Sequence, residues 1–185
     1  MPILNMIYGS GGGSGWLPST YQEVEYIQTT GTQWTNTGYT PQQWDTAEIK
    51  FNMLTLTWDE QRIFSLRQNN WGWRAWRDSN TWDTGHWFTY NTTWFDIDII
   101  ATGTCPQNAT TKEYIFAQNE RWNVYHLNKG TQRLYYCKIY RDWNLIHNYI
   151  PCYRKSDNEI WLFDIVDSNF FTNFWTWTFI KWNDV

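Results

Sequence analysis

The sequence is poor in several features that identify common classes of protein. Its 185 residues include only nine leucines, five prolines and three cysteines, and it contains no run of 18 apolar residues. The missing apolar run argues against a transmembrane helix, and the first residues lack the basic and apolar regions of a secretory signal. We therefore expect one domain of ordinary size that does not insert into a membrane.

Positive charge is also in short supply. The chain has 14 lysines and arginines against 18 aspartates and glutamates, which gives a formal net charge of -4 and a pI near 5.3. Nucleic acids and anionic membrane surfaces attract proteins that carry surplus positive charge. The charge balance therefore predicts no nucleic-acid partner.

Three cysteines are too few, and odd in number, for a disulfide framework. Residues 137–152 alternate apolar and polar side chains around a turn at Asp142 and Trp143, and such a pattern predicts a β-hairpin. Counting outward from the turn places Cys137 opposite Asn148. Cys152 then lies four residues further along, which is too far for a disulfide, so we expect free thiols.

The first 16 residues differ in composition from the rest of the chain. The apolar stretch MPILNMIY is followed by GSGGGSG, which has the composition of a flexible linker. Two interpretations are open, a natural arm that docks into a larger assembly and an engineered linker. We expect residues 1–16 to be an anchor to a larger assembly and residues 17–185 to form the folded domain.

Short β patterns follow one another from residue 21 onward. Alternation of apolar and polar side chains, which is typical of half-buried strands, occurs at residues 23–27, 47–51, 95–99, 113–116 and 134–140. Turn-forming clusters separate these segments, and no helical periodicity is sustained. The pattern predicts an all-β, antiparallel two-sheet sandwich.

The two ends of the domain resemble a known family. The stretches 17-LPSTYQEVEYIQTTGTQWTNTGYTP-41 and 135-YYCKIYRDWNLIHNYIPCYRKSDNEIWLFDIVDSNFFTN-173 are similar to laminin-G-like, concanavalin-type jelly-roll domains of phage and gut-bacterial proteins. The resemblance implies a jelly roll. It also implies a place in virion fibres, tail-associated proteins or surface adhesins, where such domains bind carbohydrate or decorate a particle.

Tryptophan is as abundant as leucine is scarce, with sixteen residues in the chain. By the same resemblance, relatives have glycine where this chain has Trp143, Trp161, Trp175 and Trp177. Glycine suits tight turns because a positive φ costs it nothing, whereas a bulky residue is strained there. Two explanations stay open: UGA codons that are read differently in the native cell, and indoles that fill a sandwich core.

The sequence offers little for a metal site. His86, His126 and His147 are isolated from one another and from cysteine, and none belongs to a zinc-binding motif. Calcium would need several oxygen ligands, and the aspartates available have no recognisable spacing: Asp78, Asp83, Asp157 and Asp167. We therefore predict no metal and no cofactor, with calcium left open.

Catalysis has equally little support. Glycoside hydrolases need two carboxylates across a cleft, and the obvious pair is Asp96 and Asp98 in the alternating segment 95–99. Alternation places both on one strand face, opposite the apolar residues, as on a solvated outer face. We therefore predict that the protein is not an enzyme.

The densest candidate for ligand binding is the segment 71–88. Strand alternation distributes its indoles over both faces, so one core cannot bury all of them. Flat aromatic rings beside polar side chains are suited to holding a sugar. The predicted ligand-binding residues are Trp73, Trp76, Trp82 and Trp87 for stacking, with Arg74, Asp83 and His86 for hydrogen bonding. Alternatively, these aromatics pack between sheets or at a subunit contact.

Together these patterns and the resemblance predict a non-catalytic, phage virion-associated module of a fibre, tail or head decoration that binds surface carbohydrate and attaches to virion proteins through residues 1–16. The alternatives are a purely structural virion subunit without a ligand and an adhesin domain of the bacterial cell surface. A homo-oligomer is compatible with either.

Overall fold

The computed structural model describes residues 17–55, 61–68, 71–77, 88–89, 98–120, 123–125, 130–174 and 178–185. The described residues form strands and turns and no helix, as the alternating patterns predict. The strands are β1 (Tyr21–Glu23), β2 (Ile27–Gln28), β3 (Thr35–Asn36), β4 (Thr46–Met53), β5 (Gln61–Gln68), β6 (Trp71–Arg77), β7 (Phe88–Thr89), β8 (Ile99–Thr104), β9 (Tyr114–Ile115), β10 (Gln118–Glu120), β11 (Asn123–Tyr125), β12 (Gln132–Arg141), β13 (Asn144–Arg154), β14 (Ile160–Asp164), β15 (Asn169–Thr172) and β16 (Ile180–Lys181). These ranges accordingly hold no helix of the length and apolarity needed to cross a membrane.

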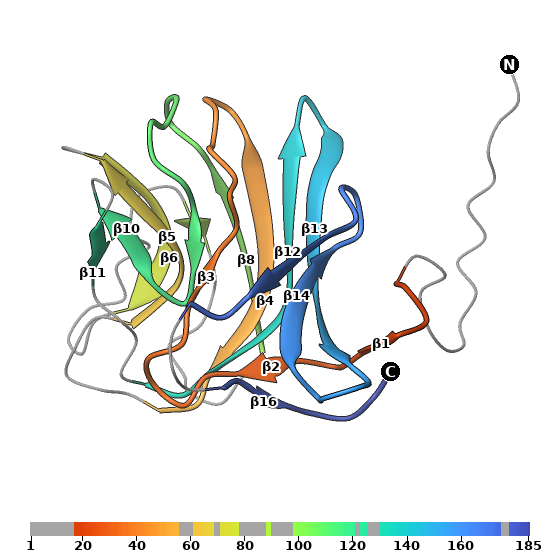
Figure 1. The fold of residues 1–185 in the computed structure, drawn as a ribbon. Helices are drawn as coiled ribbons and strands as arrows, with labels where there is room; N and C mark the ends of the chain where they lie inside the picture. The colour runs from red at the N-terminus through yellow and green to blue at the C-terminus, as the bar shows by residue number, and fades with distance from the viewer. Residues whose placement is uncertain are drawn as a thin grey trace, which may run out of the picture.

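The strands form two sheets. A ten-stranded sheet runs in the order β15-β14-β13-β12-β4-β8-β7, with β1 paired to β13 and β2 linking β12 to β16. A six-stranded sheet runs β11-β10-β5-β9-β3, with β6 on β5. Pairing is antiparallel except between β10 and β5. Figure 1 shows the long strands β13, β12, β4 and β8 side by side, with the smaller sheet next to them.

One large hydrophobic core contains residues of both sheets. On β4 the buried side chains alternate, with Ile49 and Phe51 inside, and they meet the buried Phe64 and Leu66 of β5 in the same cluster. Each such side chain contributes about 1.5–3 kcal/mol through burial. The all-β prediction is confirmed, and two sheets around one core are compatible with a sandwich.

A second, smaller cluster lies around β13 and β14. Buried Ile150 and Phe163 pack with residues from the start of the described chain, including Leu17 and Tyr21. The Tyr21 ring stacks on Phe170 with centroids 4.0 Å apart. Leu17 and Tyr21 are therefore packed into the folded unit, whereas the predicted anchor, residues 1–16, lies outside the described residues.

The predicted hairpin is formed by β12 and β13, but its register differs from the prediction. The turn pairs Arg141 with Asn144 as expected. A β-bulge then follows, so that Cys137 faces Tyr149 and not Asn148. A bulge adds one residue to one strand and reverses which face the following side chains occupy. The expectation of free thiols is nevertheless confirmed, since all three cysteines are free and buried.

Two exposed tryptophans have a backbone conformation that favours glycine. Asp142 and Trp143 form the hairpin turn with φ values of 49° and 67°, the pattern of a type I′ turn. The Trp143 side chain is 95% exposed. Trp44 has a φ of 72° and is 69% exposed. Neither indole gains burial that would offset the strained backbone.

Candidate functional site

Two adjoining hollows lie where the loop after β3 meets β13 and the turn between β14 and β15. Their volumes are about 440 and 390 Å³, and both are lined by Tyr39, Thr40, His147 and Asp167. We call the pair the His147 hollow. The remaining lining residues are Gln42, Arg141, Leu145, Ile146 and Val166 in one part, and Thr37, Gly38, Asn169 and Phe171 in the other.

The sequence Asn-Thr-Gly-Tyr, which begins with the last residue of β3, forms a tight turn. The Asn36 side-chain oxygen accepts a hydrogen bond from the backbone N–H of Gly38, which has a φ of +72°. Glycine is needed there because other residues are strained at that φ. The Thr37 hydroxyl donates to the backbone oxygen of Glu113. The turn thereby directs Tyr39 inward, and its side chain is buried.

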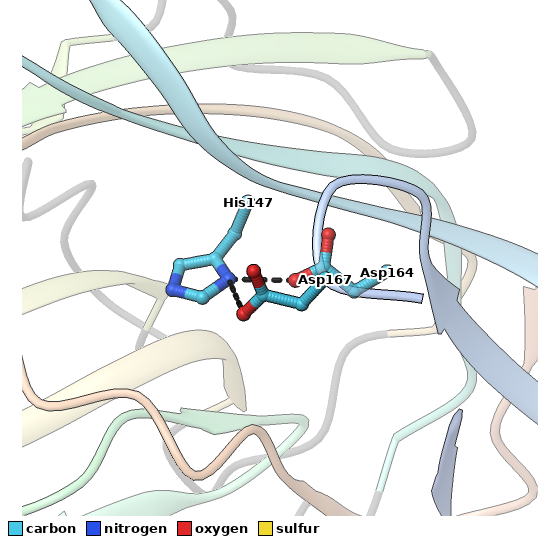
Figure 2. A group of neighbouring side chains, drawn as sticks. All are labelled: His147, Asp164 and Asp167. Carbon is cyan, nitrogen blue, oxygen red and sulfur yellow. Dashed lines mark hydrogen bonds and ion pairs between the residues drawn. The ribbon is translucent and has the colours of Figure 1, made fainter. Parts of the chain in front are cut away.

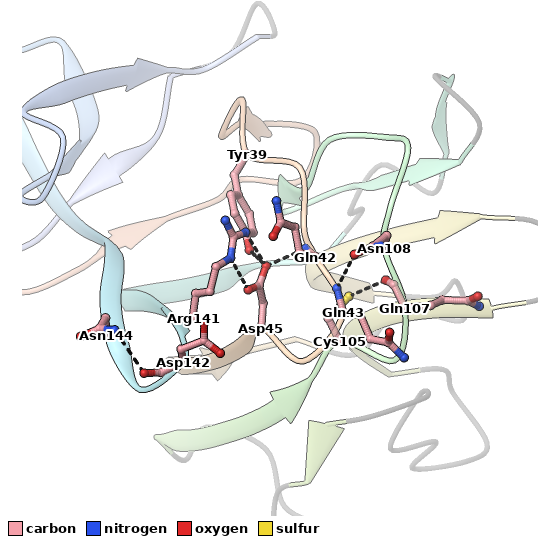
Figure 3. A network of polar contacts seen from close by, with 10 residues as sticks. All are labelled: Tyr39, Gln42, Gln43, Asp45, Cys105, Gln107, Asn108, Arg141, Asp142 and Asn144. Atoms are coloured by element: carbon pink, nitrogen blue, oxygen red, sulfur yellow. Dashed lines mark hydrogen bonds and ion pairs between the residues drawn. The ribbon is translucent and has the colours of Figure 1, made fainter.

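Asp45 holds Tyr39 and Arg141, two residues that line the hollow, in place. Its buried carboxylate accepts hydrogen bonds from the Tyr39 hydroxyl and, at 2.8 and 2.9 Å, from Nε and Nη2 of Arg141 (Figure 3). Burial alone would raise the pKa of Asp45, but the hydrogen bonds from Arg141 and Tyr39 outweigh it and hold that pKa below its usual value. Asp45 therefore stays ionised at neutral pH and orients both partners.

Backbone contacts attach the loop before β4 to the segment that follows β8. The Gln43 N–H donates to the side-chain oxygen of Asn108 at 2.9 Å (Figure 3). The Trp44 N–H donates to the Cys105 oxygen at 2.9 Å. Gln43 also donates its side-chain amide to Pro106. This side chain is therefore turned toward the 105–108 segment, while the neighbouring Gln42 lines the hollow.

His147 is held by a buried carboxylate. Its Nδ1 lies 2.6 Å from Oδ2 of Asp164 and 3.5 Å from Oδ2 of Asp167, and Nε2 points away from both (Figure 2). The ring packs edge-on against Tyr39 and stacks on Tyr149. These contacts leave the His147 side chain 17% exposed. The bulge places His147 opposite the buried Ile139, which accounts for its inward direction.

Asp164 also shapes the turn that carries Asp167. Its side chain is 0% exposed. Oδ1 accepts the backbone N–H groups of Asn148 at 2.9 Å and Val166 at 3.0 Å, while Oδ2 faces His147. Burying a carboxylate is costly unless its oxygens are hydrogen-bonded, and here both are. The turn places Asp167 at the rim, with its side chain 48% exposed.

The arrangement is suited to binding a polar ligand. Aromatic rings of Tyr39 and Phe171 line the hollow together with Arg141, Asp167 and Asn169, which supply hydrogen-bond donors and acceptors. Ligand pockets typically have 300–1,000 Å³ and a few convergent polar groups among apolar ones. Both hollows fall in that range.

The structure corrects one member of the predicted ligand-binding set and leaves the others untested. Trp73 and Ala75 share the core face of β6, as the alternation predicts, and both are buried. The indole of Trp73 meets the ring of Phe64 edge-on at 5.0 Å, so it is not available to stack on a sugar. Arg74 and Trp76 belong to β6, but their side chains lie outside the described part. Trp82, Asp83, His86 and Trp87 also lie outside it.

The structure describes some of the aspartates that the sequence offered as catalytic or calcium-binding candidates. In the segment 95–99 only residues 98 and 99 are described, and there Asp98 is exposed and Ile99 buried, as expected of an outer face. Asp98 accepts a hydrogen bond from Tyr135 at 2.6 Å and pairs with Lys50 at 3.2 Å. Asp157 pairs with Arg154 at the surface. Asp78, Asp96 and His126 lie outside the described residues.

The residues of the His147 hollow were not predicted as a site. A signal was present for Asp164, because it is a charged residue that shares the face of Leu162 in an alternating strand. A polar residue on a core face needs a partner. His147 gave no such signal, since its direction depends on the bulge.

Comparison with known proteins adds no relative. A scan against protein-family models, a search of curated proteins and a search of solved structures each return no significant match.

Proposed function

We propose that this chain is a non-catalytic carbohydrate-binding module with a jelly-roll fold, carried on a phage virion, and that the His147 hollow is its sugar site. The observation that carries the proposal is the hollow itself. Aromatic and aliphatic walls meet convergent hydrogen-bonding side chains there, in volumes typical of small-ligand sites. The resemblance of the chain ends to laminin-G-like domains supports the fold and the virion setting.

The carboxylates of the hollow favour binding over catalysis. A glycoside hydrolase needs two carboxyl groups free to act on opposite sides of the bond that breaks. Asp164 is fully buried and has both oxygens engaged, one by two backbone N–H groups and one by His147. Asp167 is then the one accessible carboxylate among the described residues that line the hollow.

The segment 71–88 is kept as a second candidate sugar surface without Trp73. Trp76, Trp82 and Trp87 remain its stacking candidates, and exposed aromatic clusters commonly mark interaction sites. Alanine substitutions at these three positions test this surface separately from the hollow.

The test of the hollow is a glycan array with the purified full chain, followed by titration of a bound glycan against matched variants. Gln42→Ala and Asn169→Ala each remove one exposed polar side chain from the hollow. We expect each to weaken binding by about 0.5–1.5 kcal/mol, the worth of one hydrogen bond. Gln43→Ala is the control, because its side chain is turned toward Pro106, and it should bind like the original chain.

Two results would count against the proposal. If no glycan binds, the alternative of a purely structural subunit is favoured. If a glycan binds and both hollow variants retain full affinity, the sugar site lies elsewhere, with the segment 71–88 next to be examined. Electron microscopy of intact particles tests the virion setting against the bacterial cell surface.

A further inference from the structure

Three potential metal ligands converge beside the hollow although they are scattered in the sequence. The Nδ1 atom of His147 and one carboxylate oxygen each of Asp164 and Asp167 all lie within 4.8 Å of one another. Figure 2 shows Nδ1 directed at both carboxylates. The ligands come from β13, from the end of β14 and from the turn that follows, so no motif spacing could have indicated them.

The two carboxylates of this group are not paired with the arginine that lines the same hollow, because Arg141 is bound to Asp45. Asp164 and Asp167 contribute two carboxylates, and among the described residues no lysine or arginine forms an ion pair with either one. The ionisable side chain that both carboxylates contact is that of His147. A divalent cation would neutralise the pair of negative charges in a place where one carboxylate is fully buried.

We propose that His147, Asp164 and Asp167 bind a first-row divalent ion, with Zn²⁺ as the ion of reference. One imidazole nitrogen and two carboxylate oxygens suit zinc, whereas calcium and magnesium prefer oxygen ligands alone. Three protein ligands with an open fourth position are typical of zinc sites that exchange a ligand. Because His147 and Asp167 line the hollow, that position is filled by water or by a hydroxyl group of a ligand in the hollow.

One of the ligand distances already suits the ion, and a second must lengthen. At metal–ligand distances of about 2.0–2.2 Å, tetrahedral ligands lie about 3.3–3.6 Å apart. The Nδ1 to Asp167 distance of 3.5 Å already matches. The 2.6 Å contact between Nδ1 and Asp164 is shorter and must lengthen by about 0.7–1.0 Å for both atoms to bind the ion. Two backbone N–H groups hold the Asp164 carboxylate in place, so the buried ligand is already oriented.

Zinc titration of the chelator-treated full chain tests this inference, which does not rest on glycan binding. Calorimetry should show one strong site, and Co²⁺ should give the visible absorption of a tetrahedral nitrogen and oxygen site. Asp167→Asn changes an exposed side chain and should leave the metal-free melting temperature unaltered, yet it should weaken zinc binding at least about tenfold. His147→Gln should weaken binding to a similar extent. Asp142→Asn removes the same charge from the nearby hairpin turn and should have no effect.

The outcomes separate this inference from the proposed function. Absence of saturable zinc binding would overturn it, as would binding that survives both ligand substitutions, because the zinc would then be held elsewhere. In either case the His147 and Asp164 contact is a structural hydrogen bond. Repeating the glycan titration with and without chelator reports on sugar binding separately, since a zinc site without a glycan refutes only the carbohydrate proposal.

Discussion

Replacing Trp143 with glycine should make the protein more stable, which is the opposite of the usual effect of deleting a large side chain. Trp143 has a φ of 67° in the hairpin turn, and its indole is 95% exposed. A left-handed conformation costs an ordinary L-residue roughly 1–2 kcal/mol. Glycine escapes that cost but loses roughly 0.5–1 kcal/mol more conformational entropy on folding. The net expectation is a gain of about 0.5–1 kcal/mol in the free energy of unfolding.

Urea unfolding of W143G measures this gain, and W182G is the matched control. Trp182 is also substantially exposed, at 49%, but its φ is not positive, and its ring stacks on Tyr26 at 5.6 Å. Glycine there should cost about 1 kcal/mol through the lost aromatic contact and the added chain entropy. The reasoning is refuted if W143G is destabilised, or if both variants change stability in the same direction. Trp44→Gly should behave like W143G, because Trp44 has a φ of 72°.

The same backbone positions bear on the UGA hypothesis. If the native cell inserts glycine at some of these codons, protein purified from its natural source will have an intact mass below the 22.5 kDa of the chain with sixteen tryptophans. A mass that matches all sixteen eliminates the hypothesis and leaves the strained turns as a property of the folded protein.

Three further expectations follow. Burial raises the pKa of Cys105 and Cys152 to about 12, so the thiols should be inert in the native state, and all three should react after denaturation without prior reduction. Fewer than three would contradict the hairpin register. Burial also raises the pKa of Glu113 well above 4.5. The unfolded chain therefore releases this proton first as the pH rises, and stability falls between pH 4.5 and the folded pKa. Glu113→Gln should remove that fall, so its stability advantage in urea unfolding should be larger at pH 8 than at pH 5, and an equal advantage at both would refute this. Deleting residues 1–10 should leave the melting temperature unchanged and prevent incorporation into the assembly, whereas a large loss of melting temperature would identify a core strand.

The sequence predicted the strands better than it predicted the site. The alternation of apolar and polar residues located β4, β9 and β12, because a strand in a sheet with one buried face directs every second side chain into the core. Alternation also placed Trp73 and Ala75 on one face of β6, but it could not decide which face packs on the core. In the structure both side chains are buried in the core. The hairpin turn was predicted correctly from the alternation on either side of Asp142 and Trp143. The bulge beyond it was not, because a bulge depends on the contacts of both strands.

That single bulge determines whether the site exists. Without the extra residue, the pairing counted from the turn would place His147 on the outer face of β13, away from Tyr39 and Asp164. With it, His147 faces Asp164 and borders the hollow. A one-residue change of register reverses every following side chain, so a site that depends on such a change cannot be found by counting along the sequence.

The polar groups behind the hollow suggest why this end of the protein is the place to look for function. Asp45 and Asp164 are fully buried carboxylates whose oxygens are all engaged. Glu113 is buried as well, its backbone oxygen accepts the Thr37 hydroxyl, and burial raises the pKa of its carboxyl group. Buried carboxylates reduce stability unless they are compensated. Proteins tend to break the rules of stable folding at functional sites. Hydrogen bonds compensate Asp45 and Asp164, so the buried Glu113 is the group that reduces stability behind the loop with Tyr39. This cost is an argument, independent of the shape of the hollow, for testing ligands there first.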